Sequence, residues 1–488
     1  MRTELPIATG YYVSSSTPVA SQQCTNMYVN IPETEGYTKA QLFQTPGIDL
    51  ILNTGEAEKN RGAHVMAGVP YFVNGQKLYR VDRNVSFSGV ESFSFTELGA
   101  IDGAEYVSMA NNGSQLCIVV PGIKGYIYTA STGVLTEITA PAYYDLGPSM
   151  QVVYIDGYFV HQSQRNVFCS GLNDGLSYDG LDFAEAEANP DDITAIHASR
   201  SQLFIGGSET TEVWQNQGTL TGLPFQRVQG FVMPIGIKSR NSVVDMSNSF
   251  AFVGSDIGGQ ASIYQYDGNN FQKISTGAIE FLLLKYSAEQ IAGIIGFSYS
   301  QNGAVFAGWI LPDTCIVYDQ KASQLAQKPV WHERKSFIGG IEGRWRANCV
   351  VQAYNRFFVG DYRSGRIGVL SINIFKEFGE FIRRRWTAGP FNNAEGATYW
   401  NSIQLIVEAG TATVEGRAPS IDMSYSNDGG KTFTTESTRN IGKIGEYTQY
   451  PTWNRLGLCR NARVYQFDYA DDAKLAVIGL IGDFDGGR

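Results

Sequence analysis

The residues of this chain that could perform acid–base chemistry are carboxylates between residues 156 and 209. A glycosidase needs two carboxyl groups held on either side of the bond that it breaks. No pattern in the sequence pairs such groups here, and turn capping or solvation explains acidic residues in loops. We therefore predict no catalytic pair. The candidates are Asp156, Asp182, Asp191, Asp192 and Glu209.

Other kinds of reactive site are not indicated by the sequence either. No glycine-rich phosphate loop lies between a strand and a helix, and no G-x-S-x-G nucleophile motif occurs. The acidic stretches 468–474 and 483–487 do not fit the calcium-binding loop, which ends in a glutamate. The histidines lie far apart, without a second ligand at metal spacing. We predict no catalytic residue, cofactor site or metal site; the histidines are His64, His161, His197 and His332.

One motif with a defined geometry lies at residues 424–433, where SYSNDGGKTF contains the pattern S-x-D-x-G-x-T-F. This pattern resembles the Asp-box turn of sialidase-like propellers. Asp428 can accept hydrogen bonds from the amides of the turn, and Gly430 permits a positive φ. Because the box occurs once, we interpret it as a structural turn. A glycan-binding or sialidase-like propeller remains the alternative function.

A run of basic residues, Arg383, Arg384 and Arg385, is followed by Trp386. Successive side chains on a strand point to opposite faces, so the three guanidinium groups would not form one DNA-binding patch. We therefore predict that these four residues contribute to an interface with another subunit or partner; a solvated strand end is the alternative. The substitutions Arg384→Glu and Arg385→Glu are predicted to impair assembly while leaving the chain folded.

The elements that position these residues are hairpins that recur from residue 68 to residue 377. Each copy has an apolar strand with an aromatic or aliphatic anchor, a loop with glycine, and a second strand with a large side chain. The anchors recur about every 45 residues, the period of a four-stranded propeller blade. We predict an all-β fold with a propeller of six to seven blades. The anchors are Tyr71, Leu116, Phe159, Phe204, Phe252, Phe306 and Phe358.

The blade pattern divides the chain into four predicted parts. Residues 1–67 form an extended arm that either adds a closing strand to the last blade or reaches a neighbouring subunit. The propeller takes residues 68–377, an arginine-rich connector takes 378–394, and a β-sandwich-like domain takes 395–488. Within the propeller, Ser287 is predicted to cap one helix, and the preceding IEFLLL at 279–284 is interpreted as a strand.

Composition narrows the class of protein further. The chain has 488 residues and a net charge of −10, so it lacks the basic footprint of a general nucleic-acid wrapper. Its N-terminus has no apolar signal segment, and no apolar run approaches the roughly 18 residues of a membrane-spanning helix. The six cysteines are dispersed, which is typical of synthesis in a reducing cytoplasm.

Several motifs, in their order along the chain, resemble the packaged-DNA stabilisation proteins that form the tail hub, or nozzle, of short-tailed phages. N-x-Y-V-N at 26–30 and TPGI at 45–48 are similar to their opening. PDDITAI followed by FIGGSETTEVW at 190–214 is similar to their middle blades, and residues 279–299 to their helix-bearing insertion. A strand pair near the end is similar through Trp453, Arg455, Gly457 and Arg460.

The resemblance implies a virion structural protein rather than an enzyme. Such proteins form a hexameric ring that extends the DNA channel below the portal and its adaptor, and they help to retain the packaged genome. The expected partners are the adaptor, a needle or plug protein, tail fibres or spikes, and DNA that passes without sequence-specific contact. The expected location is the virion tail, after synthesis in the bacterial host cytoplasm, with no membrane insertion and no cofactor.

Overall fold

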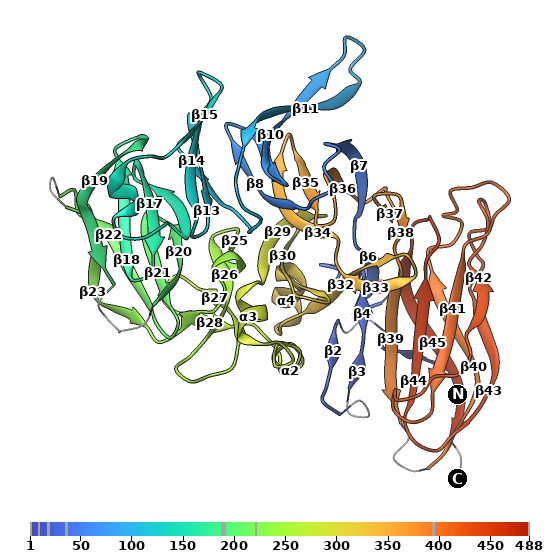
Figure 1. The fold of residues 1–488 in the computed structure, drawn as a ribbon. Helices are drawn as coiled ribbons and strands as arrows, with labels where there is room; N and C mark the ends of the chain where they lie inside the picture. Colours follow the sequence, from blue (N-terminus) through green and yellow to red (C-terminus); the bar gives the residue numbers. More distant parts are fainter. Residues whose placement is uncertain are drawn as a thin grey trace.

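The computed structural model describes residues 2–7, 10–16, 20–34, 38–186, 192–219, 222–392 and 396–486. Within these ranges strands dominate and the helices are short. Figure 1 shows a propeller with a sandwich of mostly orange and red strands at its side. The all-β prediction is confirmed, and the two parts correspond to the predicted propeller and sandwich.

Seven four-stranded antiparallel sheets form the blades of the described propeller, and the inner strand of the fifth is split in two. Blades 1 to 3 are β8 (Asn60–Met66), β9 (Val69–Asn74), β10 (Lys77–Val85), β11 (Glu91–Ala100); β12 (Ser108–Asn111), β13 (Gln115–Val120), β14 (Lys124–Thr129), β15 (Val134–Glu137); β16 (Gln151–Ile155), β17 (Tyr158–Ser163), β18 (Asn166–Gly171), β19 (Asp174–Glu185). Blades 4 and 5 are β20 (Ile193–Ser199), β21 (Gln202–Gly207), β22 (Thr211–Asn216), β23 (Phe225–Met233); β24 (Gly236–Ile237) with β25 (Val244–Met246), β26 (Ser249–Ser255), β27 (Ser262–Tyr266), β28 (Phe271–Lys273). Blades 6 and 7 are β29 (Ile295–Gln301), β30 (Ala304–Ile310), β31 (Cys315–Asp319), β32 (Trp331–Ile338); β34 (Ala347–Ala353), β35 (Arg356–Asp361), β36 (Arg366–Ser371), β7 (Gly47–Asn53).

The blades form a closed ring. Inner strands contact their neighbours in chain order, and β34 of the last blade contacts β8 of the first. All seven predicted anchors lie on the second strand of their blades, where their side chains are buried between sheets. Strand β7 of the N-terminal arm is the outer strand of blade 7 and pairs with β36 from Ser371↔Gly47 to Arg366↔Asn53. The arm therefore closes the propeller, which is the first of its two expected roles.

Two sheets face each other in the sandwich, and the N-terminal arm contributes to both. The interior between them contains Trp386, Trp400, Trp453 and Phe467. One sheet has the order β43 (Thr452–Cys459), β40 (Thr398–Val407), β45 (Ala476–Gly486), β6 (Gln41–Gln44), β5 (Met27–Asn30), with β1 (Arg2–Leu5) also on β45. The other has β4 (Cys24–Thr25), β39 (Arg384–Phe391), β44 (Arg463–Tyr469), β41 (Ser420–Ser426) and β42 (Ser437–Asn440).

The strand pairing differs from the predicted boundaries in two places. The predicted connector 378–394 contains β39, which is a sandwich strand rather than a linker. The predicted arm 1–67 contributes strands to both parts. Its strand β4 pairs with β39 of the sandwich and, through Thr25↔Glu333, with β32 of blade 6. One continuous sheet therefore runs from the propeller into the sandwich. Three short hairpin strands complete its surroundings: β33 (Ile341–Arg344), β37 (Lys376–Glu377) and β38 (Glu380–Phe381).

The helix prediction is confirmed at one segment and wrong at the neighbouring one. Helix α3 (Ala288–Ala292) begins at Ser287, whose side chain accepts from the Gln290 amide in a capping box. The preceding segment is helix α2 (Gly277–Leu283), not a strand, because its apolar side chains pack against blades 5 and 6. The remaining elements are α1 (Pro141–Tyr144), α4 (Gln320–Ala326), η1 (Arg240–Ser242), β2 (Tyr12–Val13) and β3 (Ser21–Gln22).

Two histidines, His161 and His332, are buried in this fold and His64 is half-buried, and desolvation lowers the pKa values of all three. The pKa falls to about 4 for His64 and to about 3 for His161 and His332. In the unfolded chain a histidine has a pKa of about 6.5. As the pH falls below 6.5, these histidines therefore bind protons in the unfolded chain but stay neutral in the folded chain. Stability contributed by these neutral histidines is lost as the pH falls from about 6.5 toward 4.

Replacing His332 by leucine is expected to make the chain less sensitive to acid. His332 has no side-chain hydrogen bond among the described residues, so the substitution removes mainly its titration. Between pH 6 and pH 4.5, the free energy of unfolding should fall less steeply, by up to about 1.4 kcal/mol per pH unit. Urea unfolding of both proteins across this range measures the difference. Equal slopes would show that His332 is protonated in the folded chain.

Candidate functional site: the propeller–sandwich junction

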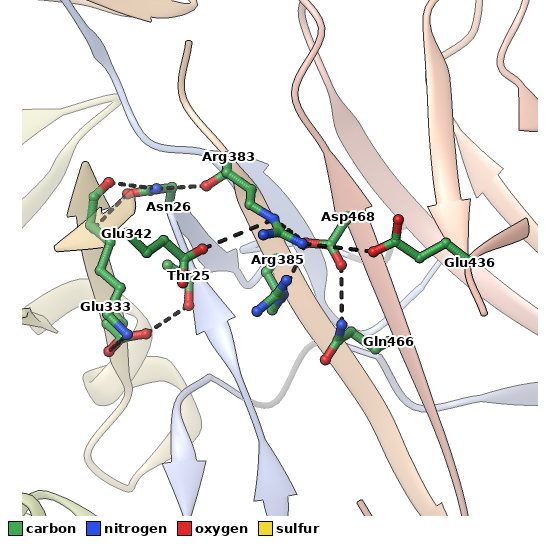
Figure 2. Close-up of polar contacts among 10 residues, drawn as sticks. Thr25, Asn26, Glu333, Glu342, Arg383, Arg385, Glu436, Gln466 and Asp468 are labelled. Atoms are coloured by element: carbon green, nitrogen blue, oxygen red, sulfur yellow. Dashed lines mark hydrogen bonds and ion pairs between the residues drawn. The ribbon is translucent and has the colours of Figure 1, made fainter. Parts of the chain in front are cut away.

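The predicted arginine run lies where the sandwich meets blade 6, and two of its side chains converge on one carboxylate. Arg383 Nε and Arg385 Nε donate to Asp468 Oδ1 over 2.8 and 2.9 Å. Gln466 Nε2 donates to the other oxygen of Asp468 over 3.1 Å. Figure 2 shows this group, with Glu436 on the far side. The alternation of a strand places Arg383 and Arg385 on the same face.

Arg383 also links the sandwich to the propeller. Its guanidinium lies 4.0 Å from Glu342 of β33 and 3.8 Å from Glu436, while it bonds Asp468 of β44. The side chain of Asn26 bridges the same two parts. Its Nδ2 donates to the backbone carbonyls of Lys335 and Arg383 over 2.8 and 2.7 Å. The junction is thus held by polar contacts between segments far apart in the sequence (Figure 2).

The arm enters this junction through Thr25 and Asn26. Thr25 Oγ1 donates to Glu333 Oε2 over 2.7 Å, and the Asn26 amide donates to the Glu333 carbonyl over 2.7 Å. Asn26 has a φ of 57°, a left-handed conformation that asparagine tolerates better than most residues. Lys335 lies 3.0 Å from the same Glu333 carboxylate. These contacts anchor the short strand β4 between two larger sheets.

The other two residues of the run point away from Asp468 and are buried. Arg384 has no exposed area; it donates to the carbonyls of Ile382 and Phe375 over 3.3 Å each and lies over the ring of Tyr469. Burial lowers the pKa of Arg384 to about 10. Trp386 stacks on Phe467 in the sandwich interior, with ring centroids 5.4 Å apart.

Within the described chain, then, the run connects two parts of one molecule. Arg384 and Trp386 are covered by their own chain, so neither side chain reaches a partner in this conformation. Arg383 and Arg385 keep partial exposure, with side-chain fractions of 29% and 21%. An intermolecular contact of the run stays a prediction, and it is confined to these two guanidinium groups.

A buried ionic cluster that the sequence did not indicate lies beside the junction. Glu377 accepts from Trp345 Nε1 over 2.9 Å and from the Ser336 hydroxyl, and it lies 3.7 Å from Arg334. Arg334 is fully buried and stacks over Trp345 at 3.9 Å. Arg346 forms a two-bond pair with Asp361, each bond 3.0 Å long. Charged residues within otherwise buried strands were the available signal.

The candidate carboxylates lie in loops and outer strands. Asp156 occupies an exposed turn, Asp182 lies on the outer strand β19, and Asp192 pairs with Arg165 over 3.0 Å. Glu209 lies between β21 and β22. Asp191 lies outside the described residues. Within the described ranges, no three His, Cys, Asp or Glu side chains are grouped to hold a metal ion.

The Asp box forms a structured turn in the sandwich between β41 and β42. Asp428 Oδ1 accepts from the amides of Lys431 and Thr432 over 2.9 and 3.0 Å, and Asp428 Oδ2 accepts from the Thr432 hydroxyl. These bonds and that from Ser426 lower the pKa of Asp428. Gly430 has a φ of 96°, as expected of this turn. The carboxylate is therefore engaged in holding the backbone.

The other motif residues are divided between the interior and the surface of the sandwich. Trp453 is buried and its Nε1 donates to the Ser437 carbonyl over 2.7 Å. Arg455 and Arg460 are exposed, and Gly457 has a φ of 73° at an irregularity of the strand pair. Sequence reasoning missed Arg463, a buried guanidinium 4.3 Å from the Tyr425 ring centroid.

The fold and these contacts define a class of architecture: an all-β protein built of a propeller and a sandwich that share a continuous sheet. The sequence model of a family described as "Bacteriophage P22 Gp10, beta-propeller" matches residues 3–375. A second, described as "Bacteriophage P22 Gp10, beta-sandwich", matches residues 384–481. The chain belongs to this bacteriophage family, which its two models match over nearly the whole sequence.

Two further comparisons accompany these matches. The chain is 24% identical over 405 residues to "Tail hub protein gp10" of Salmonella phage P22, covering 81% of this chain and 83% of that protein. Together with the family match, this relative shows a tail hub structural protein of the virion, not an enzyme. Among solved structures, the computationally designed Ika8 protein is 12% identical with a TM-score of 0.37, covering 66% of this chain and 99% of that one. The TM-score to the designed protein is too low to support a conclusion about fold or function.

Proposed function

We propose that this tail hub protein assembles as a hexameric ring that extends the DNA channel below the portal and its adaptor. The ring retains the packaged genome and anchors a needle or plug and fibres or spikes. The observation that carries the proposal is the match to a tail hub protein over most of both chains. The partners of the ring are the adaptor, the needle, the fibres or spikes, and DNA that slides past without sequence-specific contact.

The centre of the propeller supports a channel that lies between copies rather than within one. Tyr106, just before the inner strand of blade 2, packs against the buried cluster of blades 6 and 7 that contains Phe297 and Trp345. Arg240 of blade 5 donates to the Met150 carbonyl beside blade 3 over 3.0 Å. Because these pairs are not neighbours in the ring of blades, their contacts bring side chains across the axis. A DNA duplex would have to pass outside a single propeller.

The charge of the chain supports the same arrangement. With a net charge of −10, the chain repels a phosphate backbone on average, so a channel lined by it binds DNA only weakly.

None of the helices in the described ranges has the length and apolar composition that crossing a lipid bilayer requires. A closed ring of identical chains needs two different contact surfaces on each copy.

Symmetry-resolved cryo-electron microscopy of virions that carry the chain tests this function. We expect six copies around an axial channel directly below the portal and adaptor, with the propeller axes offset from the channel. Density for DNA within a propeller, a copy number other than six, or a location at a fibre tip would overturn the proposal. The glycan-binding alternative predicts the last of these and a sugar in a pocket.

A further inference from the structure

The outer hairpin of blade 1 extends beyond the other blades and carries exposed apolar side chains at its tip. Strands β10 and β11 project away from the propeller (Figure 1). Phe87 at the tip is fully exposed, and Val85 and Val90 on either side are 57% and 64% exposed. Large apolar side chains grouped at a projecting tip are typical of a contact surface.

Hydrogen bonds hold this tip in one conformation before any partner is present. The Ser86 amide donates to the Val90 carbonyl and the Gly89 amide to the Ser86 carbonyl, each over 2.9 Å. The Val90 amide also donates to Ser86 Oγ over 2.9 Å. Gly89 has a φ of 79°, which only glycine adopts at little cost. Because the tip is preformed, docking Phe87 costs little conformational entropy.

The charge at the base of the hairpin is positive. Arg83 and Arg356 both pair with Glu91, so two guanidinium groups share one carboxylate. Residues 84–90 carry no charge. The β10–β11 hairpin therefore presents an apolar tip next to an excess of one positive charge, on a chain whose total charge is negative.

A complementary surface lies on the outer edge of blade 3. Strand β19 leaves one of its edges unpaired and has exposed apolar side chains, including Leu181 at 74% and Leu172 of the preceding turn at 62%. Acidic residues are interspersed with them; in the described part of the chain none of these is ion-paired with lysine or arginine, and Asp174 and Asp179 accept only from the backbone amides of Leu176 and Leu181. These acidic residues are Asp174, Asp179, Asp182 and Glu185.

We propose that the β10–β11 tip of one copy docks on the β19 edge of the next copy in the ring. Phe87 contacts the apolar side chains around Leu181, while Arg83 and Arg356 face the carboxylates of β19, which have no cationic partner within their own chain. The inference rests on the proposed ring and names the contact that closes it. Tip and edge lie on different sides of the molecule (Figure 1), as a head-to-tail contact requires.

A second copy satisfies both surfaces better than other occupants. Two chains of charge −10 repel each other unless their contact joins positive to negative groups. The base of the β10–β11 hairpin and the β19 edge provide that pairing. An anionic membrane surface would be repelled by the acidic β19 edge. A different virion protein would have to be basic at one surface and acidic at the other.

Cysteine cross-linking in assembled tails tests the contact. The double variant Phe87→Cys/Leu181→Cys should give a ladder of cross-linked chains after oxidation, and either single variant should give none. The six native cysteines are all buried, so they do not contribute to the ladder. Rings without a ladder in the double variant would overturn this contact and leave the proposed function standing. Absence of a ring in virions of the native chain would overturn the proposed function itself.

A second variant measures the contribution of the phenyl group. Phe87→Ser should lower incorporation into tails by at least about tenfold, because truncating a central aromatic anchor commonly costs more than 1.4 kcal/mol. The matched control is Ile257→Ser, which removes an exposed apolar side chain from a turn in blade 5 and should leave incorporation unchanged. Melting curves of both variants should equal that of the native chain. Equal incorporation of the two variants would contradict docking through Phe87.

Discussion

Replacing Glu377 by alanine is expected to lower the free energy of unfolding by about 3–5 kcal/mol, the usual cost of removing one partner from a buried ion pair. Arg334 has no exposed area and would keep its charge beside an empty position. Trp345 Nε1 and the Ser336 hydroxyl would lose their acceptor at the same time. Urea unfolding followed by tryptophan fluorescence measures the change.

Two controls separate the charge of Glu377 from its hydrogen bonds. Glu377→Gln keeps an acceptor for Trp345 but removes the charge that faces Arg334, so its loss of stability should be smaller than that of alanine. Glu380→Ala removes an exposed carboxylate from the same hairpin and should change stability by no more than about 0.5 kcal/mol. If Glu377→Ala were as stable as Glu380→Ala, Arg334 would not depend on the ion pair.

The propeller could be predicted from the sequence because each blade repeats the same local pattern. Anchors such as Tyr71, Phe204 and Phe358 occupy equivalent buried positions on second strands, so their spacing is the spacing of the blades. The outer strand of blade 7 could only be stated as an alternative. It comes from Gly47–Asn53, some 300 residues away from its partner, and the pairing of distant segments has no local signal.

The same limitation explains the sandwich boundaries and the missed helix. Strand β4 has two residues, too few for a periodic pattern, yet it joins two sheets. The apolar run at 279–284 is compatible with a buried strand or a buried helix, since periodicity does not separate the two in short apolar segments. Packing against Ile274, Trp309 and their neighbours makes it a helix.

The junction could be predicted in part. Strand alternation separated Arg384 from Arg383 and Arg385, but it could not say which face was buried. That depends on β44, which places Asp468 on one side of β39 and Tyr469 on the other. Glu377 and Arg334 were visible in the sequence only as charged residues, and no local pattern could pair them, because they lie on β37 and β32, which the fold brings together.

Arg384→Glu is expected to destabilise the folded chain by about 4–5 kcal/mol, in contrast to the expectation from sequence that the chain stays folded. The new carboxylate would lie where the guanidinium donates to the carbonyls of Ile382 and Phe375, so oxygen would face oxygen without a donor. A buried carboxylate without hydrogen bonds is among the costliest changes a single substitution can make. Thermal and urea unfolding of the isolated chain measure this cost.

Comparison with Arg384→Met and Arg460→Glu assigns the effect to the buried charge. Methionine has a similar length and no charge, and apolar replacement of a buried ion is often nearly neutral, so Arg384→Met should be much more stable than Arg384→Glu. Arg460 is exposed, so Arg460→Glu makes the same change of charge at the surface and should cost no more than about 0.5 kcal/mol. A stable Arg384→Glu chain that fails only in tail assembly would instead place this side chain at an intermolecular contact. That result would mean that β39 turns its buried face outward when the hub assembles.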